Sequence, residues 1–168
     1  MTVRICLVRH GATAWSESGR LTGWTDIPLS PRGRAEARGL RSRLEGRRFV
    51  GVWSSDLARA VETAKIAASP PTQDRRLREL DFGELEGKGW NDLLPEMRRA
   101  LLAFEGFQAP GGESLDQLRF RVAEFVNELV PGEHLMVTHG GVARLLLRNA
   151  GRDQVLAPAS VGEATIDL

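Results

Sequence analysis

Two histidines in the sequence each follow a short apolar run. His10 comes after the run 3–8 and Arg9, and His139 comes after the run 135–137 and a threonine. An imidazole nitrogen can act as a nucleophile or a base near neutral pH. An arginine adds a fixed planar cation that binds the oxygens of an oxyanion. These residue types predict chemistry on an anionic group, and a dianionic phosphate suits them best.

The apolar runs before these histidines are predicted to be strands of one sheet, because both are short and rich in aliphatic residues. Ligands of open α/β sheets bind at the carboxyl ends of the strands, so His10 and His139 are expected to face one pocket. The N–H groups of Gly140 and Gly141, at the start of a helix, would attract an anion. The alternative is that each strand merely ends in polar residues, which either motif alone permits.

Arg59 is a further candidate for binding an anion. It lies in the first turn of a helix predicted over residues 57–67. A cation at that end opposes the helix dipole, and a bound anion would remove the conflict. The alternative interpretation is a solvated surface arginine.

The segment 78–87 carries four carboxylates and two glycines, which favours a loop over a regular helix. Phosphoryl transfer needs one carboxylic acid near the leaving oxygen, and the pattern alone does not say which of the four it is. The sequence lacks the cysteine and carboxylate cluster of a zinc site and the Gly-rich loop of nucleoside triphosphatases. The predicted chemistry is therefore phosphoryl transfer, with an unprotonated His10 attacking phosphorus.

Strands and helices are predicted to alternate along the chain, which favours a three-layer α/β fold. The predicted strands are 3–8, 49–53, 135–137 and an edge strand over 164–168. The predicted helices are 31–44, 57–67, 91–104, 115–130 and 142–149, with loops over 11–30, 78–87 and 110–114. Three helix-start signals are present: Ser30 with Pro31, the cluster Ser54-Ser55-Asp56, and Ser114 with Gln117.

Composition sets the class of protein. The 168 residues, 42% hydrophobic and 27% charged, predict a single soluble domain spanning 1–168. The net charge of +1 argues against nucleic acid as a partner, and no apolar run approaches membrane-spanning length. With no signal peptide, we expect a cytoplasmic protein. Cys6 is predicted to be a small core residue, and His134, placed before its strand, a surface residue.

The sequence resembles the histidine phosphatase superfamily, in its phosphoglycerate-mutase-like branch. The matching blocks follow the family's order, at 7–11, 21–30, 54–64, 78–83 and 137–141. The resemblance implies an α/β/α fold in which helices flank a mixed, mostly parallel sheet, and a reaction that needs no metal or cofactor. It also implies that His10 is the phosphorylated nucleophile and Glu79 the proton donor.

Other residues match positions that hold the phosphate or the substrate in the family: Arg9, Arg59, His139, Gly140, Thr22 and Gly23. Glu113 and Ser114 match a loop near the pocket. The sequence departs from the mutases at Ala12, where they commonly have Glu, and at Ser16, where an Asn contributes to the phosphate pocket. Ser16 would make a shorter, weaker contact at that position.

The mutases also carry a longer insertion where this chain has only residues 84–110. The resemblance therefore favours a metal-independent phosphatase of a small phosphorylated metabolite, closest to the α-ribazole-5′-phosphate phosphatase type of cobalamin assembly. A cofactor-dependent phosphoglycerate mutase is the alternative, and a non-catalytic phosphate-binding protein comes third. The oligomeric state stays open, with a homodimer possible.

Overall fold

The computed structural model describes residues 2–167, and five strands form one sheet in the order β3-β2-β4-β1-β5. The strands are β1 (Thr2–Arg9), β2 (Gly51–Ser54), β3 (Thr72–Gln73), β4 (Gly132–Thr138) and β5 (Val161–Asp167). Four of them run parallel, and β5 runs antiparallel to β1 at the edge. The predicted mixed, mostly parallel sheet is confirmed, and Leu168 lies outside the described residues.

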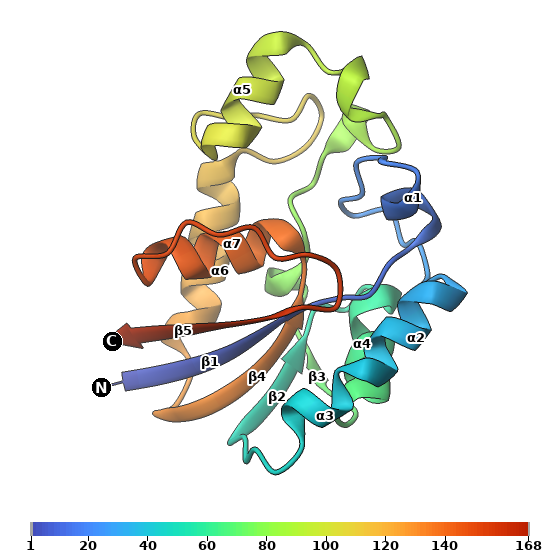
Figure 1. The fold of residues 1–168 in the computed structure, drawn as a ribbon. Coiled ribbons are helices and arrows are strands. Elements are labelled where there is room, and N and C mark those ends of the chain that lie inside the picture. Colours follow the sequence, from blue (N-terminus) through green and yellow to red (C-terminus); the bar gives the residue numbers. More distant parts are fainter. Residues whose placement is uncertain (1, 168) are drawn as a thin grey trace.

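Helices cover both faces of the sheet (Figure 1). The α-helices are α1 (Ala14–Glu17), α2 (Pro31–Gly39), α3 (Arg41–Leu44), α4 (Ala58–Ala67), α5 (Pro95–Ala103), α6 (Leu115–Asn127) and α7 (Gly140–Asn149). Short 3₁₀ turns are η1 (Arg75–Leu77), η2 (Gly83–Leu85) and η3 (Trp90–Asp92). Helices α6 and α7 lie on one face, α2, α3 and α4 on the other, and α5 stands above the carboxyl edge.

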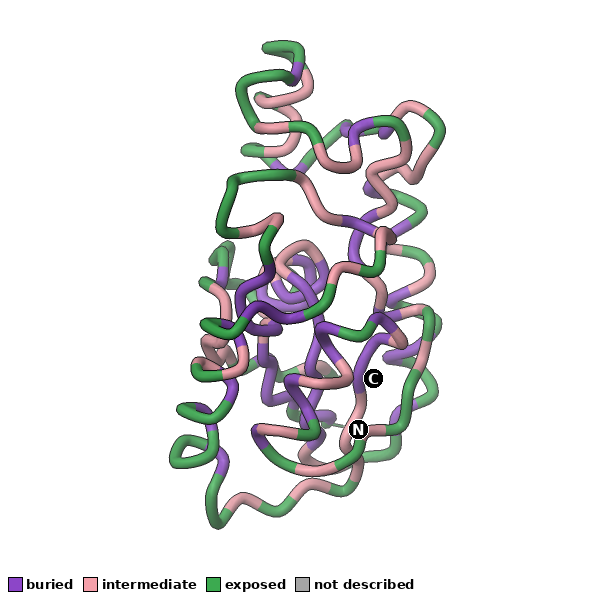
Figure 2. The backbone as a smooth tube through the Cα atoms, turned by 90° about the vertical axis from the view of Figure 1, so that its right-hand side faces the viewer, coloured by how far each residue is buried: buried purple, intermediate pink, exposed green. Residues whose placement is uncertain are grey.

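Alternation along β1 and β4 divides the core in two. Ile5 and Leu7 pack with α6 and α7, whereas Cys6 and Val8 pack with α3 and α4. Side chains of a strand point alternately to opposite faces, so the continuous apolar run of β1 serves both layers. Figure 2 shows buried residues in the interior and exposed residues on the outer loops. Cys6 is a core residue as predicted, and burial raises the pKa of its thiol to about 11.

Helix starts agree with the sequence in two cases and differ in a third. Ser30 caps α2 with Pro31 at the first helical position, and Ser114 forms a capping box with Gln117 at α6. Helix α4, however, has no side-chain cap of its own, and the N–H of Ala58 donates to Asp26 from a distant loop. The polar residues before α4 are therefore available for contacts elsewhere.

Two predicted helices have different bounds. The helix predicted over 31–44 divides at Leu40, where the N–H of Leu40 donates to the Ala37 carbonyl in a tighter turn. The helix predicted over 91–104 begins only at Pro95, because proline disfavours helical geometry in the residue before it. The short α1 and β3 were not predicted.

The prediction that His134 lies on the surface is wrong. Strand β4 begins at Gly132 rather than at residue 135, so His134 lies inside the sheet between β1 and β2 and is buried. Trp53 Nε1 donates to His134 Nδ1 at 3.1 Å, and His134 Nε2 donates to the Val130 carbonyl at 2.9 Å. A polar residue at the start of an apolar run is easily mistaken for a residue outside the strand.

The chain that follows β1 touches the start of α2 backbone to backbone. A Cβ atom on Gly33 would collide with the carbonyl oxygen of Ala12, and one on Gly11 with the carbonyl of Gly33. Only glycine at both positions allows this approach, which fixes the path of the backbone directly after His10.

The substitution Gly33→Ala is therefore expected to destabilise the protein by about 1–3 kcal/mol, because backbone must move to admit the methyl group. Gly39→Ala in the same helix is the control, since nothing lies within 4 Å of a Cβ there. It should be neutral or stabilising by up to about 1 kcal/mol. Urea denaturation measures both, and equal stability of the two variants would contradict the close approach.

Candidate active site

His10 and His139 meet at the carboxyl edge of the sheet, as the sequence predicts. Their ring centroids lie 5.0 Å apart. The N–H of His10 donates to the carbonyl of Thr138, which ties the end of β1 to the end of β4. The His10 ring is nearly buried, and its Nδ1 lies 2.7 Å from the Gly11 carbonyl. A carbonyl only accepts, so Nδ1 carries the proton and Nε2 carries the lone pair.

The surroundings keep both imidazoles neutral. Burial, and then the positive charge of Arg59, lower the pKa of His10 to about 3. Burial and Arg59 also lower the pKa of His139 well below its usual value, and His10 adds to the effect. A neutral His10 whose proton is held on Nδ1 has the protonation state that a nucleophile needs at Nε2.

Two arginines supply the positive charge. Arg59 is fully buried, and its guanidinium donates to the carbonyls of Thr25 at 3.0 Å and Gly23 at 2.6 Å. Arg9 donates to the carbonyl of Leu156 at 2.6 Å. Burial lowers the pKa of both guanidiniums, and the charge of Glu79 opposes that shift. The alternative of a solvated surface Arg59 is wrong.

Within residues 2–167, the buried side-chain nitrogens that lack a hydrogen-bond partner are Arg9 Nε, Arg59 Nε and His139 Nδ1. All three belong to residues predicted from the sequence to bind an anion. Buried polar atoms without a partner are rare, because each costs free energy. An oxyanion beside His10 would supply the missing acceptors, so the arrangement suits a bound phosphate.

Glu79 lies close enough to Arg9 and Arg59 for its charge to act on both guanidiniums. Its Oε1 accepts the N–H of Leu80 at 2.9 Å, and its Oε2 accepts the N–H of Gly141 at 3.0 Å. Its main-chain carbonyl accepts from Trp24 Nε1 and Arg121 Nη2, both at 2.8 Å. The carboxyl group is held next to the start of α7.

The other residues predicted to contact the substrate make hydrogen bonds or contacts within the protein. Ser16 closes the capping box of α1 with Thr13, and the Thr22 hydroxyl donates to the carbonyl of Arg20. The N–H of Gly23 donates to Glu86. Gly140 lies against Arg9, since a Cβ there would be 3.3 Å from its guanidinium carbon. Substrate contacts of Ser16, Thr22, Gly23 and Gly140 stay predictions.

The loop predicted near the pocket contributes through Glu113. This carboxylate pairs with Arg121 at 2.7 Å and accepts the N–H of Asp81 at 3.0 Å. Arg121 in turn donates to the carbonyl of Glu79, so Glu113 supports the segment that carries Glu79. Ser114 caps α6, as its sequence context predicts.

Reasoning from the residues missed three supports of the site. Ser55 shares a 2.7 Å hydrogen bond with His139 Nε2, and Thr63 accepts the N–H of Gly11 at 3.1 Å. Glu86 accepts the N–H groups of Gly23 and Trp24. Ser55 was assigned to a helix-start cluster, and nothing local distinguishes Thr63 from an ordinary helical residue.

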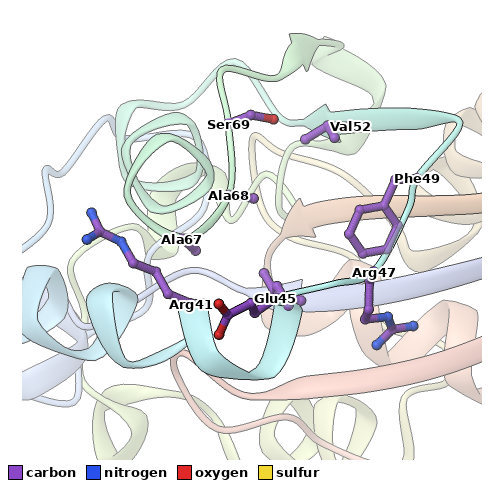
Figure 3. A pocket seen from close by; sticks show the side chains of 9 residues that line it. Arg41, Glu45, Arg47, Phe49, Val52, Ala67, Ala68 and Ser69 are labelled. Atoms are coloured by element: carbon purple, nitrogen blue, oxygen red, sulfur yellow. The ribbon is translucent and has the colours of Figure 1, made fainter.

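A hollow of about 440 Å³ near the amino end of β2 contains none of the predicted site residues (Figure 3). Two of its arginines already have partners within the protein, since Arg47 pairs with Glu133 and Glu163, and Arg41 donates to the carbonyl of Ile66. We therefore assign the chemistry to the cluster of His10, His139, Arg9 and Arg59 at the carboxyl edge of the sheet. Among residues 2–167, no group of His, Cys, Asp or Glu is placed to hold a metal ion. No helix of that part is long and apolar enough to span a membrane.

Two neutral imidazoles among buried arginines, at the carboxyl edge of a mostly parallel sheet, are features of an α/β enzyme that binds an oxyanion. The chain belongs to the histidine phosphatase superfamily, branch 1, whose family model matches residues 5–160. The family resemblance is thereby confirmed.

Relatives agree with this assignment. The 2,3-bisphosphoglycerate-dependent phosphoglycerate mutase 2 of Gloeobacter violaceus is 34% identical over 184 residues, which cover 97% of this chain and 81% of that protein. The crystal structure of TTHB049 from Thermus thermophilus superposes with a TM-score of 0.88 at 44% identity, over 98% of this chain and 92% of that one. YhfR of Bacillus stearothermophilus gives 0.83 at 31% identity, over 96% and 90%. The predicted fold class is confirmed.

His10 is expected to stay neutral down to about pH 4 in the folded protein, since its pKa is lowered to about 3 from 6.5. Between those two values the unfolded chain binds a proton at His10 that the folded chain does not. The free energy of unfolding should therefore fall as the pH drops below about 6.5. Imidazole NMR spectra between pH 8 and 4 and urea denaturation at each pH measure the two effects.

His10→Asn is the control, because it removes the titrating group at similar size. Its stability should depend less on pH between 6.5 and 4 than that of the wild type. A His10 titration midpoint near 6.5 would refute the neutral state.

Proposed function

We propose that the protein is a metal-independent phosphomonoesterase that hydrolyses a small phosphorylated metabolite through a phosphohistidine on His10. The observation that carries the proposal is the Nδ1–H bond of His10 to the Gly11 carbonyl, which leaves Nε2 as a neutral nucleophile among cations. Arg9, Arg59 and His139 are assigned to the phosphate, and Glu79 to proton transfer.

The reaction has two steps. His10 Nε2 attacks phosphorus, the bond to the leaving oxygen breaks, and the Glu79 carboxylic acid gives that oxygen its proton. Arg9 and Arg59 balance the charge on the phosphoryl oxygens during the transfer. Glu79, now a carboxylate, then takes a proton from water, whose oxygen attacks phosphorus. The P–N bond breaks, and its electron pair returns to Nε2 as inorganic phosphate leaves.

Hydrolysis is favoured over mutase activity because the arginines near the site are already paired with carboxylates of the protein. A mutase substrate carries a second anionic group, which needs a cation of its own. Arg78, Arg121 and Arg144 are instead each paired with a carboxylate, of Asp56, Glu113 and Asp153. The short segment 84–110 also offers less cover to exclude water from a phosphohistidine. The mutase remains the second candidate because a relative bears that name.

α-Ribazole 5′-phosphate is the proposed physiological substrate, on the strength of the sequence resemblance. The test is phosphate release from a panel of phosphorylated metabolites, including this compound and 3-phosphoglycerate, in excess chelator. We expect one compound to be hydrolysed far faster than the others, without inhibition by the chelator. His10→Ala should abolish turnover, because it removes the nitrogen that attacks phosphorus.

The formation of 2-phosphoglycerate is followed in the same reactions. Isomerisation of 3-phosphoglycerate without net phosphate release would establish the mutase instead. Retained turnover in His10→Ala would overturn the nucleophile assignment. Binding of phosphate esters without any turnover would leave only a phosphate-binding protein.

Glu79→Gln should slow alkyl phosphate esters more than p-nitrophenyl phosphate. The nitrophenolate ion is a good leaving group and needs little protonation, whereas an alkoxide needs the proton of Glu79. A loss on alkyl esters of roughly 10²–10⁴-fold is the usual contribution of a general acid. An equal loss on both substrates, measured as kcat, would count against Glu79 as the acid.

A further inference from the structure

A second pocket, of about 160 Å³, opens directly beside Glu79. Its walls are apolar side chains from three parts of the chain: Leu80, Phe82, Leu101, Phe104 and Val155. They belong to the segment after η1, to the end of α5 and to the loop after α7. An apolar cavity of about 150 Å³ admits one benzene ring, so this pocket has the size of a single ring.

The pocket shares a wall with the phosphate site. Glu79, Gly140 and Gly141 line it, and the Gly141 N–H donates to the Glu79 carboxylate. Gly140 also lies against the guanidinium of Arg9. The carboxyl group of Glu79 therefore lies between the phosphate-binding cations and the apolar walls. A proton donor acts at the bond between phosphorus and the leaving alcohol, so the alcohol is directed into the pocket.

The single cation among these described lining residues does not make the pocket polar. Arg144 pairs with Asp153 at 2.7 Å and donates to the carbonyls of Leu101 and Leu102. Its guanidinium also lies over the ring of Phe104, 4.9 Å from the centroid. Because the guanidinium of Arg144 is already paired with groups of the protein, the pocket is poorly suited to a carboxylate or a second phosphate.

Phe104 has an unusual backbone conformation at the back of this pocket. It ends α5 in the left-handed region, with φ 56° and ψ 43°, where glycine or asparagine is normally found. A bulky residue in this region is strained, and such strain gathers at functional sites. Arg119 holds it by donating to its carbonyl at 3.0 Å, while the buried ring faces the pocket.

We propose that this apolar pocket binds the alcohol portion of the substrate. The preferred substrates are then phosphomonoesters whose alcohol carries an apolar ring system, one ring of which enters the pocket, or a branched aliphatic group of similar size. The proposal rests on the phosphatase function proposed above, and it adds the chemical class that this enzyme distinguishes.

The test compares benzyl phosphate with glycerol 3-phosphate, both esters of primary alcohols with a similar need for protonation. The wild type should prefer benzyl phosphate by roughly tenfold or more in kcat/KM. Val155→Asp places a charge at the pocket, and it should lower kcat/KM for benzyl phosphate by about tenfold while changing glycerol 3-phosphate little. Val130→Asp is the matched control, since Val130 is 61% exposed and Val155 63%, and it should leave the preference unchanged.

Binding provides a measurement that does not depend on turnover. By calorimetry, 2-phenylethylphosphonate should bind the wild type more tightly than ethylphosphonate, and Val155→Asp should remove the difference. Equal affinities, or a preference that survives Val155→Asp, would overturn the pocket assignment. If the phenyl preference in binding holds but neither ester nor p-nitrophenyl phosphate is hydrolysed, the phosphatase function fails and the pocket assignment stands.

Discussion

The burial of the Arg59 guanidinium is the constraint on which the rest of the site depends. A charge removed from water must find oxygens, and the carbonyls of Gly23 and Thr25 provide them. Glu86 holds the loop that carries these carbonyls, and Asp26 from the same loop caps α4, the helix that carries Arg59. Helix and loop therefore fix each other, and neither can shift without leaving a buried charge or buried amides without partners.

The same buried charge sets the state of the imidazoles. A cation beside a ring in a dry environment disfavours a second positive charge, so His10 and His139 stay neutral where a solvated histidine would begin to protonate. The bond from His10 Nδ1 to the Gly11 carbonyl then selects the tautomer. The nearby charge and the hydrogen bond together leave His10 Nε2 unprotonated. The close contact of Gly11 with Gly33 keeps the backbone after His10 in place.

The sequence predicted the parts of the site that local patterns encode. Apolar runs located β1 and β4, and their ends placed His10 and His139 at one edge. The family motifs selected Glu79 from four carboxylates. Local patterns do not predict contacts between distant segments. Three such features depend on which segments meet in the fold: the bond of Ser55 to His139, the cap that Asp26 gives α4, and the buried position of His134. The early start of β4 was missed because charged and polar residues open it.

The pairing of β1 has a consequence for how the chain acquires its structure during synthesis. Strand β1 (Thr2–Arg9) is synthesised well before its two neighbours in the sheet, β4 (Gly132–Thr138) and β5 (Val161–Asp167). The guanidinium of Arg9 likewise cannot donate to the carbonyl of Leu156 until that later residue has been made. An apolar strand must therefore remain unpaired until β4 has been made, which favours slow folding and exposes the nascent chain to aggregation. This exposure follows from the topology, and the stability of the finished fold does not remove it.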